Sequence, residues 1–165
     1  MFNSIILFAA ATALLFAAAH DVAVRTVPNQ VSLFVAVAGL ALNALNGQLV
    51  PALFGGSVVF AGAWFCWRRG WVGGGDVKLL AACALLVPPA SVPELVLSTA
   101  IAGGVLALFY VALARLLGGG ITTRPGGFLR RVWRTERRRI RRGLSLPYSC
   151  AIAAGVLLTL YVPLG

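Results

Sequence analysis

The chain has 165 residues, of which 60% are hydrophobic and 11% are charged, whereas an average soluble domain has roughly 25% charged residues. Together with a mean hydropathy of +0.93, this composition excludes a soluble globular enzyme and a disordered chain. The net charge of +10 would indicate a nucleic-acid partner in a soluble protein, but in a polytopic membrane protein it indicates cytoplasmic loops rich in Lys and Arg.

Six apolar runs follow one another along the chain. They are residues 3–19, 31–45, 49–67, 77–87, 95–117 and 146–164. Helices are expected, because open strands cannot satisfy their backbone groups in lipid. The second and fourth runs fall short of the roughly 20 residues of a full span, and they can cross only if their ends lie inside the bundle or the bilayer thins locally. We therefore predict an all-α polytopic membrane protein with about six transmembrane helices, forming one domain over residues 1–165.

The Lys and Arg residues predict how these spans are oriented. With six spans, the first, third and fifth connections face one side of the membrane, and all 14 Lys and Arg fall in or beside them. By the positive-inside rule that side is the cytoplasm, so both termini are expected on the outer, periplasmic side. A wrong number of spans would scatter the basic residues over both sides.

The fifth connection, residues 118–145, carries most of the positive charge. An apolar stripe with helical spacing runs through it: Leu129, Val132, Trp133 and Ile140. We predict an amphipathic helix here, whose arginines over residues 130–142 bind the anionic lipids of the inner leaflet. A disordered loop and a site for a partner or nucleic acid are the alternatives, and we expect no nucleic-acid partner.

Two of the four acids, Asp21 and Asp76, are predicted to lie at the same membrane face on different helices. Acids near the membrane core are costly and usually face a bundle interior or a wet cavity. Two neighbouring carboxyls cannot both ionise cheaply, so such a pair shares a proton. The ionised carboxyl can take a proton from water while the protonated one polarises a peptide carbonyl. The alternatives are a surface aspartate paired with Arg25 for Asp21, and a helix N-cap for Asp76.

Three glycines, Gly73, Gly74 and Gly75, directly precede Asp76. They allow a tight turn in which backbone or substrate approaches the carboxylate closely. We expect Gly75 to need either a positive φ or a surface without a side chain, and a loose linker is the alternative. The single histidine, His20, is interpreted as an interfacial residue, which leaves no Ser-His-Asp or Cys-His site. The three cysteines stand alone, so neither a disulfide framework nor a zinc site is expected.

Three segments together resemble one family. Residues 73–80, GGGDVKLL, resemble the G-x-G-D motif of the aspartic prepilin peptidases, the type IV leader peptidases. Residues 21–29, which run from an aspartate to Val-Pro-Asn, resemble the family's first aspartate segment. Residues 146–153 resemble the signature of its last helix, although Ser149 stands where a glycine commonly follows the tyrosine.

This resemblance implies that Asp21 and Asp76 form the catalytic pair. It also implies supporting positions: Pro28, Asn29, Gly73, Gly74, Gly75 and Lys78. Such a protein is an aspartic endopeptidase of the bacterial inner membrane that needs no cofactor or metal, and it removes the basic leader from prepilins and pseudopilins at the cytoplasmic face. The chain lacks the length and the cysteine cluster of the bifunctional members. It therefore resembles the short form found in tight-adherence (Flp) pilus systems, without N-methyltransferase activity.

Two other functions compete with this one. A small proton-coupled transporter would also use membrane carboxylates, but transporters usually carry them near the midplane and often show internal repeats. This sequence shows no repeat between its halves, and both aspartates are predicted at one face. A presenilin-like G-x-G-D protease would have a tyrosine before its first aspartate, where this chain has His20.

Overall fold

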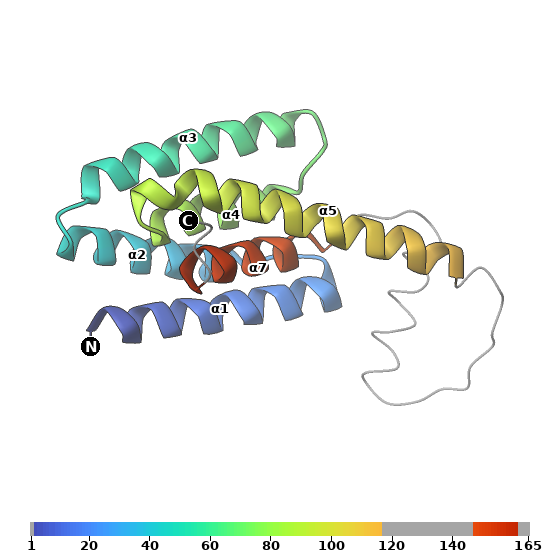
Figure 1. The fold of residues 1–165 in the computed structure, drawn as a ribbon, viewed down its shortest axis with the longest axis horizontal. Helices are drawn as coiled ribbons and strands as arrows, with labels where there is room; N and C mark the ends of the chain where they lie inside the picture. Colours follow the sequence, from blue (N-terminus) through green and yellow to red (C-terminus); the bar gives the residue numbers. More distant parts are fainter. Residues whose placement is uncertain (1, 117–146, 162–165) are drawn as a thin grey trace.

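The computed structural model describes residues 2–116 and 147–161, and the regular elements in these ranges are all helical. The elements in chain order are α1 (Phe2–Val24), α2 (Asn29–Leu45), α3 (Leu49–Arg68), α4 (Gly74–Leu86), the short 3-10 helix η1 (Pro89–Ser91), α5 (Val92–Leu116) and α7 (Tyr148–Tyr161). Successive α-helices run in opposite directions along one bundle (Figure 1). The all-α prediction is confirmed for these residues.

The helices begin and end at residues that favour turns. Pro28 has extended backbone angles and directly precedes α2, because proline fixes φ and cannot donate a backbone hydrogen bond. Gly47 joins α2 to α3 with a φ of 69°, a conformation that costs glycine little. Pro88 follows the end of α4. The helices therefore begin and end close to the residues predicted from the sequence.

Three helical segments are long and apolar enough to cross a membrane: Asn3–Val24, Leu49–Arg68 and Pro89–Leu113. The shorter helices α2 and α7 are also apolar. The 13 residues of α4 extend over about 20 Å, less than the roughly 30 Å of hydrocarbon in a bilayer. The three long segments support a membrane protein, and six spans remain a prediction.

The shortest of these α-helices, α4, lies in the middle of the bundle, in contact with α2, α3 and α7. Its buried residues point to several sides: Val77, Leu79, Ala82, Cys83, Ala84 and Leu86. Gly39 of α2 lies directly against the backbone of Leu85, and Asn43 Nδ2 donates a hydrogen bond of 2.8 Å to the Leu85 carbonyl oxygen. A helix that is apolar all round is a buried helix, so α4 and its first turn are held from several directions.

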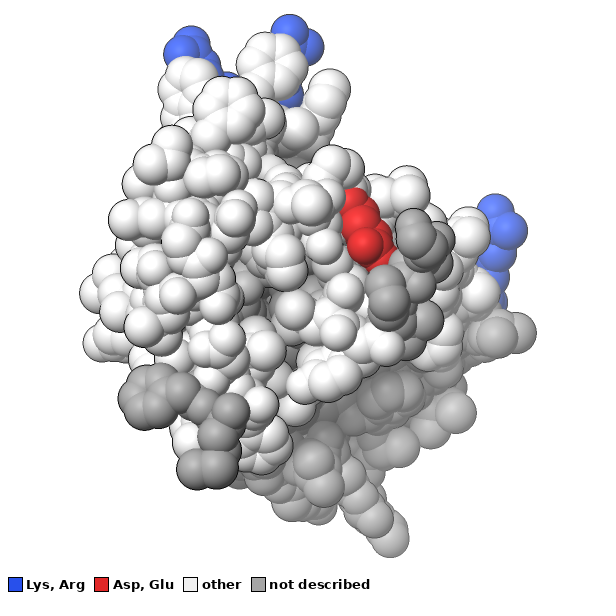
Figure 2. All heavy atoms as spheres, turned by 60° about the vertical axis from the view of Figure 1, so that its left-hand side comes forward, with Lys and Arg blue, Asp and Glu red and all other residues white. Residues whose placement is uncertain are grey.

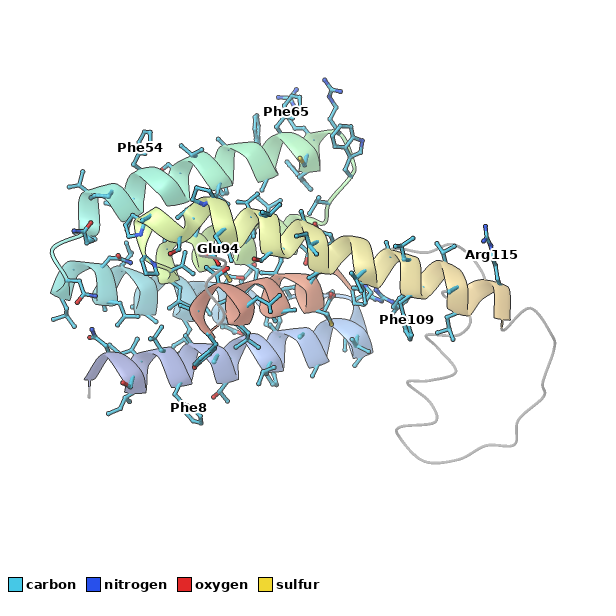
Figure 3. The ribbon with its side chains drawn as sticks, viewed as in Figure 1. Phe8, Phe54, Phe65, Glu94, Phe109 and Arg115 are labelled. Carbon is cyan, nitrogen blue, oxygen red and sulfur yellow. The ribbon has the colours of Figure 1, made fainter. Side chains whose placement is uncertain are left out.

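The outer surface of the bundle is apolar. Phe8 on α1, Phe54 on α3 and Phe109 on α5 point away from the helices and are 73%, 74% and 58% exposed (Figure 3). Exposed apolar surface on this scale is unusual for a soluble monomer and marks contact with a membrane or a partner. The surface therefore suits a lipid environment, in agreement with the composition.

Charged residues gather at the ends of the bundle. The basic residues that the structure describes all belong to the end where α1, α3 and α5 finish: Arg25, Arg68, Arg69, Lys78 and Arg115. Glu94 lies at the opposite end, near the start of α5 (Figure 3). Figure 2 brings that end forward and shows a mostly uncharged face with one small acidic spot and with Lys and Arg at its margins. This asymmetry agrees with the predicted side assignment, while the position of the termini stays a prediction. The amphipathic helix predicted within residues 118–145 lies outside the described residues.

Candidate active site

Asp21 lies in the last turn of α1, because the helix continues beyond the predicted apolar run to Val24. Arg25 ends the helix with a positive φ of 63°, and its backbone N–H donates a hydrogen bond of 2.8 Å to the Asp21 carbonyl oxygen. The Asp21 residue is only 6% exposed. The alternative of a surface aspartate is therefore wrong, and the carboxyl group points into the bundle.

The first turn of α7 contacts the C-terminal end of α1, where Asp21 lies. The Ser149 hydroxyl donates a hydrogen bond of 2.7 Å to Asp21 Oδ2, and Ser149 is completely buried. One residue further, the Cys150 thiol lies 3.7 Å from the Ala18 carbonyl oxygen. Two adjacent residues of α7 therefore contact the last two turns of α1, and one of them binds the Asp21 carboxylate.

Asp76 lies in the first turn of α4 and is not its N-cap, so that alternative is wrong as well. Gly73 is the N-cap, with φ −72° and ψ 145°, and Gly74 begins the helix. The Asp76 backbone N–H donates a hydrogen bond of 3.1 Å to the Gly73 carbonyl oxygen. The Asp76 side-chain oxygen Oδ1 is buried and has no hydrogen-bond partner among the residues that the structure describes. This leaves an acidic oxygen available for a proton, water or substrate.

The structure brings Asp21 and Asp76 to one end of the bundle, close enough for their charges to interact. Tyr148, the first residue of α7, also interacts electrostatically with Asp76. Residues from α1, α4 and α7 therefore meet around the two carboxyl groups. Such an arrangement can hold one proton between two acids.

The glycine run is the tightly contacted start of α4 and not a linker. A Cβ on any of the three would come close to a neighbour: at Gly73, 3.0 Å from Asp76 Oδ2; at Gly74, 3.3 Å from Trp67 Nε1; at Gly75, 3.2 Å from Val27 Cβ. The positive φ in this connection belongs to Gly70, so the expectation of a positive φ at Gly75 is wrong. The other expected reason, a surface without a side chain at Gly75, stays a prediction, and the close approach to Val27 supports it.

A second contact joins the same two segments. Pro28 precedes α2 and Asn29 begins it, and Lys78 Nζ donates a hydrogen bond of 3.1 Å to Asn29 Oδ1. A groove of about 610 Å³ begins beside this bond and continues between α2 and α3 over α4. Gly73, Gly74, Gly75 and Lys78 therefore lie in or directly before the first two turns of α4, and Asn29 contacts this region through Lys78. Pro28 is the residue directly before Asn29.

The other residues considered from the sequence have local roles. His20 Nδ1 lies 2.7 Å from the Thr26 carbonyl oxygen, a contact between α1 and the connection that follows it. Cys66, Cys83 and Cys150 form no disulfide bond. Within residues 2–116 and 147–161, no group of three or more His, Cys, Asp or Glu side chains is arranged to hold a metal ion.

An all-helical bundle with an apolar surface, in which two carboxyl groups interact at one end, defines a membrane protein with a candidate acid–base site. Residues 8–108 match the type IV leader peptidase family, and the chain belongs to this family. It is accordingly a peptidase of the type IV leader type that acts on prepilin-type substrates. Comparison with curated proteins and comparison with solved structures gave no match.

Ser149 is the residue of this site that the sequence did not predict. It lies outside the matched range of residues 8–108, and its contact with Asp21 joins two helices from opposite ends of the chain. The available signal was a polar residue in an apolar run, directly after Tyr148, where the resembled family commonly has a glycine.

Proposed function

We propose that the chain is a membrane aspartic endopeptidase that removes the leader peptide from type IV prepilin-like precursors of the Flp type. Cleavage takes place at the cytoplasmic face of the bacterial inner membrane, in which the chain is a multi-pass protein. The observation that carries the proposal is the pairing of Asp21 and Asp76, which come from α1 and α4 to one end of the bundle. Both lie inside the range that matches the peptidase family.

The chemistry needs one proton on the pair. The ionised carboxyl takes a proton from a water molecule, whose oxygen forms a bond to the carbonyl carbon of the scissile peptide. The protonated carboxyl gives its hydrogen to the carbonyl oxygen, so the negative charge that would develop there is neutralised. When the tetrahedral intermediate collapses, the C–N bond breaks and the leaving nitrogen takes up a proton from the first carboxyl. As the C=O bond forms again, a hydroxyl of the intermediate gives its proton back to the second carboxyl, so the pair ends with one proton, as it began.

The supporting residues fix the positions of the two aspartates relative to each other. Gly75 meets Val27 and Lys78 binds Asn29, so the start of α4 is fixed to the segment that leads from Asp21 into α2. Pro28 restricts the backbone of that segment. Gly73 leaves room for the Asp76 carboxyl group. These contacts support a role in positioning the pair, because a small displacement of a catalytic group strongly reduces the rate.

The absence of N-methyltransferase activity is part of the same proposal. The three cysteines of the sequence lie on three different helices, α3, α4 and α7, and form no disulfide bond, so they form no cluster of the kind implied for bifunctional members. A transporter is less well supported, since Asp21 and Asp76 lie at one end of the bundle and not halfway along it.

Co-expression with a tagged Flp-type prepilin, in a host without a prepilin peptidase, tests this function. We expect the precursor to lose its leader on a gel and the mature N-terminus to have an unmethylated mass. An empty vector is the control. If the membrane-inserted protein leaves every prepilin uncut, the peptidase assignment is wrong. If the mature product carries a methyl group, the peptidase-only assignment is wrong.

A further inference from the structure

We propose that Ser149 is a positioning residue that fixes where the proton of the pair resides. Its hydroxyl keeps Asp21 ionised, so Asp21 is the general base and Asp76 carries the proton that is given to the substrate carbonyl. The inference rests on the proposed function, and it adds a division of roles between the two acids together with a residue from α7.

The Ser149 hydroxyl is suited to this role by its burial and its geometry. It is completely buried, and buried hydroxyl groups need a hydrogen-bond partner. At 2.7 Å, its bond to Asp21 Oδ2 has the usual length of a hydrogen bond between a hydroxyl group and an oxygen acceptor. A donor that binds the ionised form of an acid stabilises that form. The neighbouring contact of Cys150 with Ala18 keeps α7 in place against α1.

The surroundings of Asp76 favour the protonated form. Its Oδ1 is buried, with no hydrogen-bond partner among the described residues, and an unpaired buried carboxylate is costly. Burial and the negative charge of Asp21 both act against ionisation of Asp76, and they outweigh the hydrogen bond from the Gly73 backbone. The two acids therefore differ, because one has a buried hydroxyl donor and the other does not.

Other ionisable groups on the surrounding elements remain the same when Ser149 is changed. They are His20 on α1, Arg25 directly after it, Asp76 and Lys78 on α4, and Tyr148 and Cys150 on α7. Helix α2 has no ionisable side chain over Asn29–Leu45. A comparison of Ser149 variants therefore measures the contribution of the hydroxyl group against a constant background.

The sequence makes a direct test practical, because Asp21 and Asp76 are its only aspartates. Protein labelled with ¹³C at the aspartate carboxyl and reconstituted in lipid nanodiscs will give two carboxyl signals, which Asp76→Asn assigns. In Ser149→Ala we expect Asp21 to titrate about one pH unit higher than in the wild type. Ser149→Thr, which retains the hydroxyl, should titrate like the wild type.

Cleavage provides a second readout. The acid limb of the kcat/KM profile should move upward by the same amount in Ser149→Ala, while the alkaline limb and the rate at the optimum change little. Ser149→Gly removes the hydroxyl in a second way and tests whether the shift depends on the alanine methyl group. Ser98→Ala is the matched control, since Ser98 is a buried serine on α5, and its profile should equal that of the wild type.

The outcomes separate this inference from the proposed function. If the wild type cleaves prepilin but Asp21 titrates at the same pH in wild type, Ser149→Ala and Ser149→Gly, the role of Ser149 is wrong. The assignment of the base is wrong if Asp76 is ionised and Asp21 protonated in the active pH range. If the wild type cleaves no prepilin, the proposed function fails, and the carboxyl titration still decides whether Ser149 sets the charge of Asp21.

Discussion

Asp21 and Asp76 occupy opposite ends of their helices, the last turn of α1 and the first turn of α4. The helix dipole therefore disfavours a charge on Asp21 and favours one on Asp76, by about 0.3–1 kcal/mol at each position. A hydrogen bond to a charged group contributes about 1.5–3 kcal/mol. The two helix ends together give a preference of about 0.6–2 kcal/mol, so the Ser149 bond to Asp21 opposes that preference with a contribution of similar or larger size.

Gly75 offers a test of how closely the start of α4 must approach the segment after Asp21. A methyl group there would lie 3.2 Å from Val27 Cβ, so Val27 or α4 must move. We expect the cleavage rate at matched membrane protein level to fall about fivefold in Gly75→Ala, as for a strain of about 1 kcal/mol, and further in Gly75→Val.

Gly62→Ala on α3 is the matched control, because a Cβ at Gly62 meets nothing within 4 Å. It should cleave at the wild-type rate. Equal rates for wild type, Gly75→Ala and Gly75→Val would show that the contact with Val27 does not matter for the site.

The sequence predicted both aspartates and the glycines before Asp76, because these features lie next to one another in the chain or recur in a known motif. It did not predict the bond from Ser149 to Asp21, since no local pattern reports which residue of one helix faces another. It also left open whether Asp76 is the N-cap of α4. Capping depends on backbone angles, and those place the cap at Gly73.

At the scale of elements, the apolar runs predicted helices within a few residues of their observed ends. The fourth run is the informative case: its sequence showed a short apolar segment, and the structure shows α4 in contact with α2, α3 and α7. Apolar spacing cannot distinguish a central helix from one that faces lipid on one side, because both are apolar all round. The close contacts that glycines on neighbouring helices make with α4 show that α4 is the central helix.

Two close contacts at glycines predict how substitutions there change the thermal stability of the protein. A Cβ at Gly39 would collide with the Leu85 backbone of α4, and a Cβ at Gly155 would lie 2.8 Å from the Thr99 backbone nitrogen of α5. Gly39→Ala and Gly155→Ala should each lower the thermal unfolding midpoint in detergent by roughly 5 °C, because overpacking costs about 1–3 kcal/mol.

Gly104→Ala on α5 is the control for both. A Cβ at Gly104 meets nothing within 4 Å, and alanine is favoured over glycine inside a helix by roughly 0.5–1 kcal/mol. Its midpoint should therefore stay the same or rise slightly. A midpoint that also stays constant in Gly39→Ala and Gly155→Ala would contradict the close approach of α2 to α4 and of α7 to α5.

At the scale of the whole molecule, alternating helix directions place the described basic residues at one end and Glu94 at the other (Figures 1 and 3). The same alternation brings both aspartates to the basic end. The orientation of the bundle in the membrane therefore determines on which side of the membrane the two aspartates lie. If the basic end faces the cytoplasm, as the positive-inside rule predicts, the pair meets its substrate there.

Reporter fusions test that orientation. Fusions after Gly47 and after Pro89 should report the periplasmic side, and a fusion after Arg69 should report the cytoplasm, because these positions lie at opposite ends of the bundle. A cytoplasmic signal after Gly47 would contradict the six-span topology and would separate the two aspartates across the membrane.

The central claim is that Asp21 and Asp76 share one proton in peptide hydrolysis, and the most direct measurement is leader cleavage by Asp21→Asn and Asp76→Asn in reconstituted membranes. Each change keeps the size of the side chain and removes its acid–base chemistry, so we predict a fall of about 1000-fold or more for both. Glu94→Gln, at the other end of the bundle, should cleave like the wild type. Cleavage within about tenfold of the wild-type rate in either asparagine variant, at equal membrane protein level, would contradict the account.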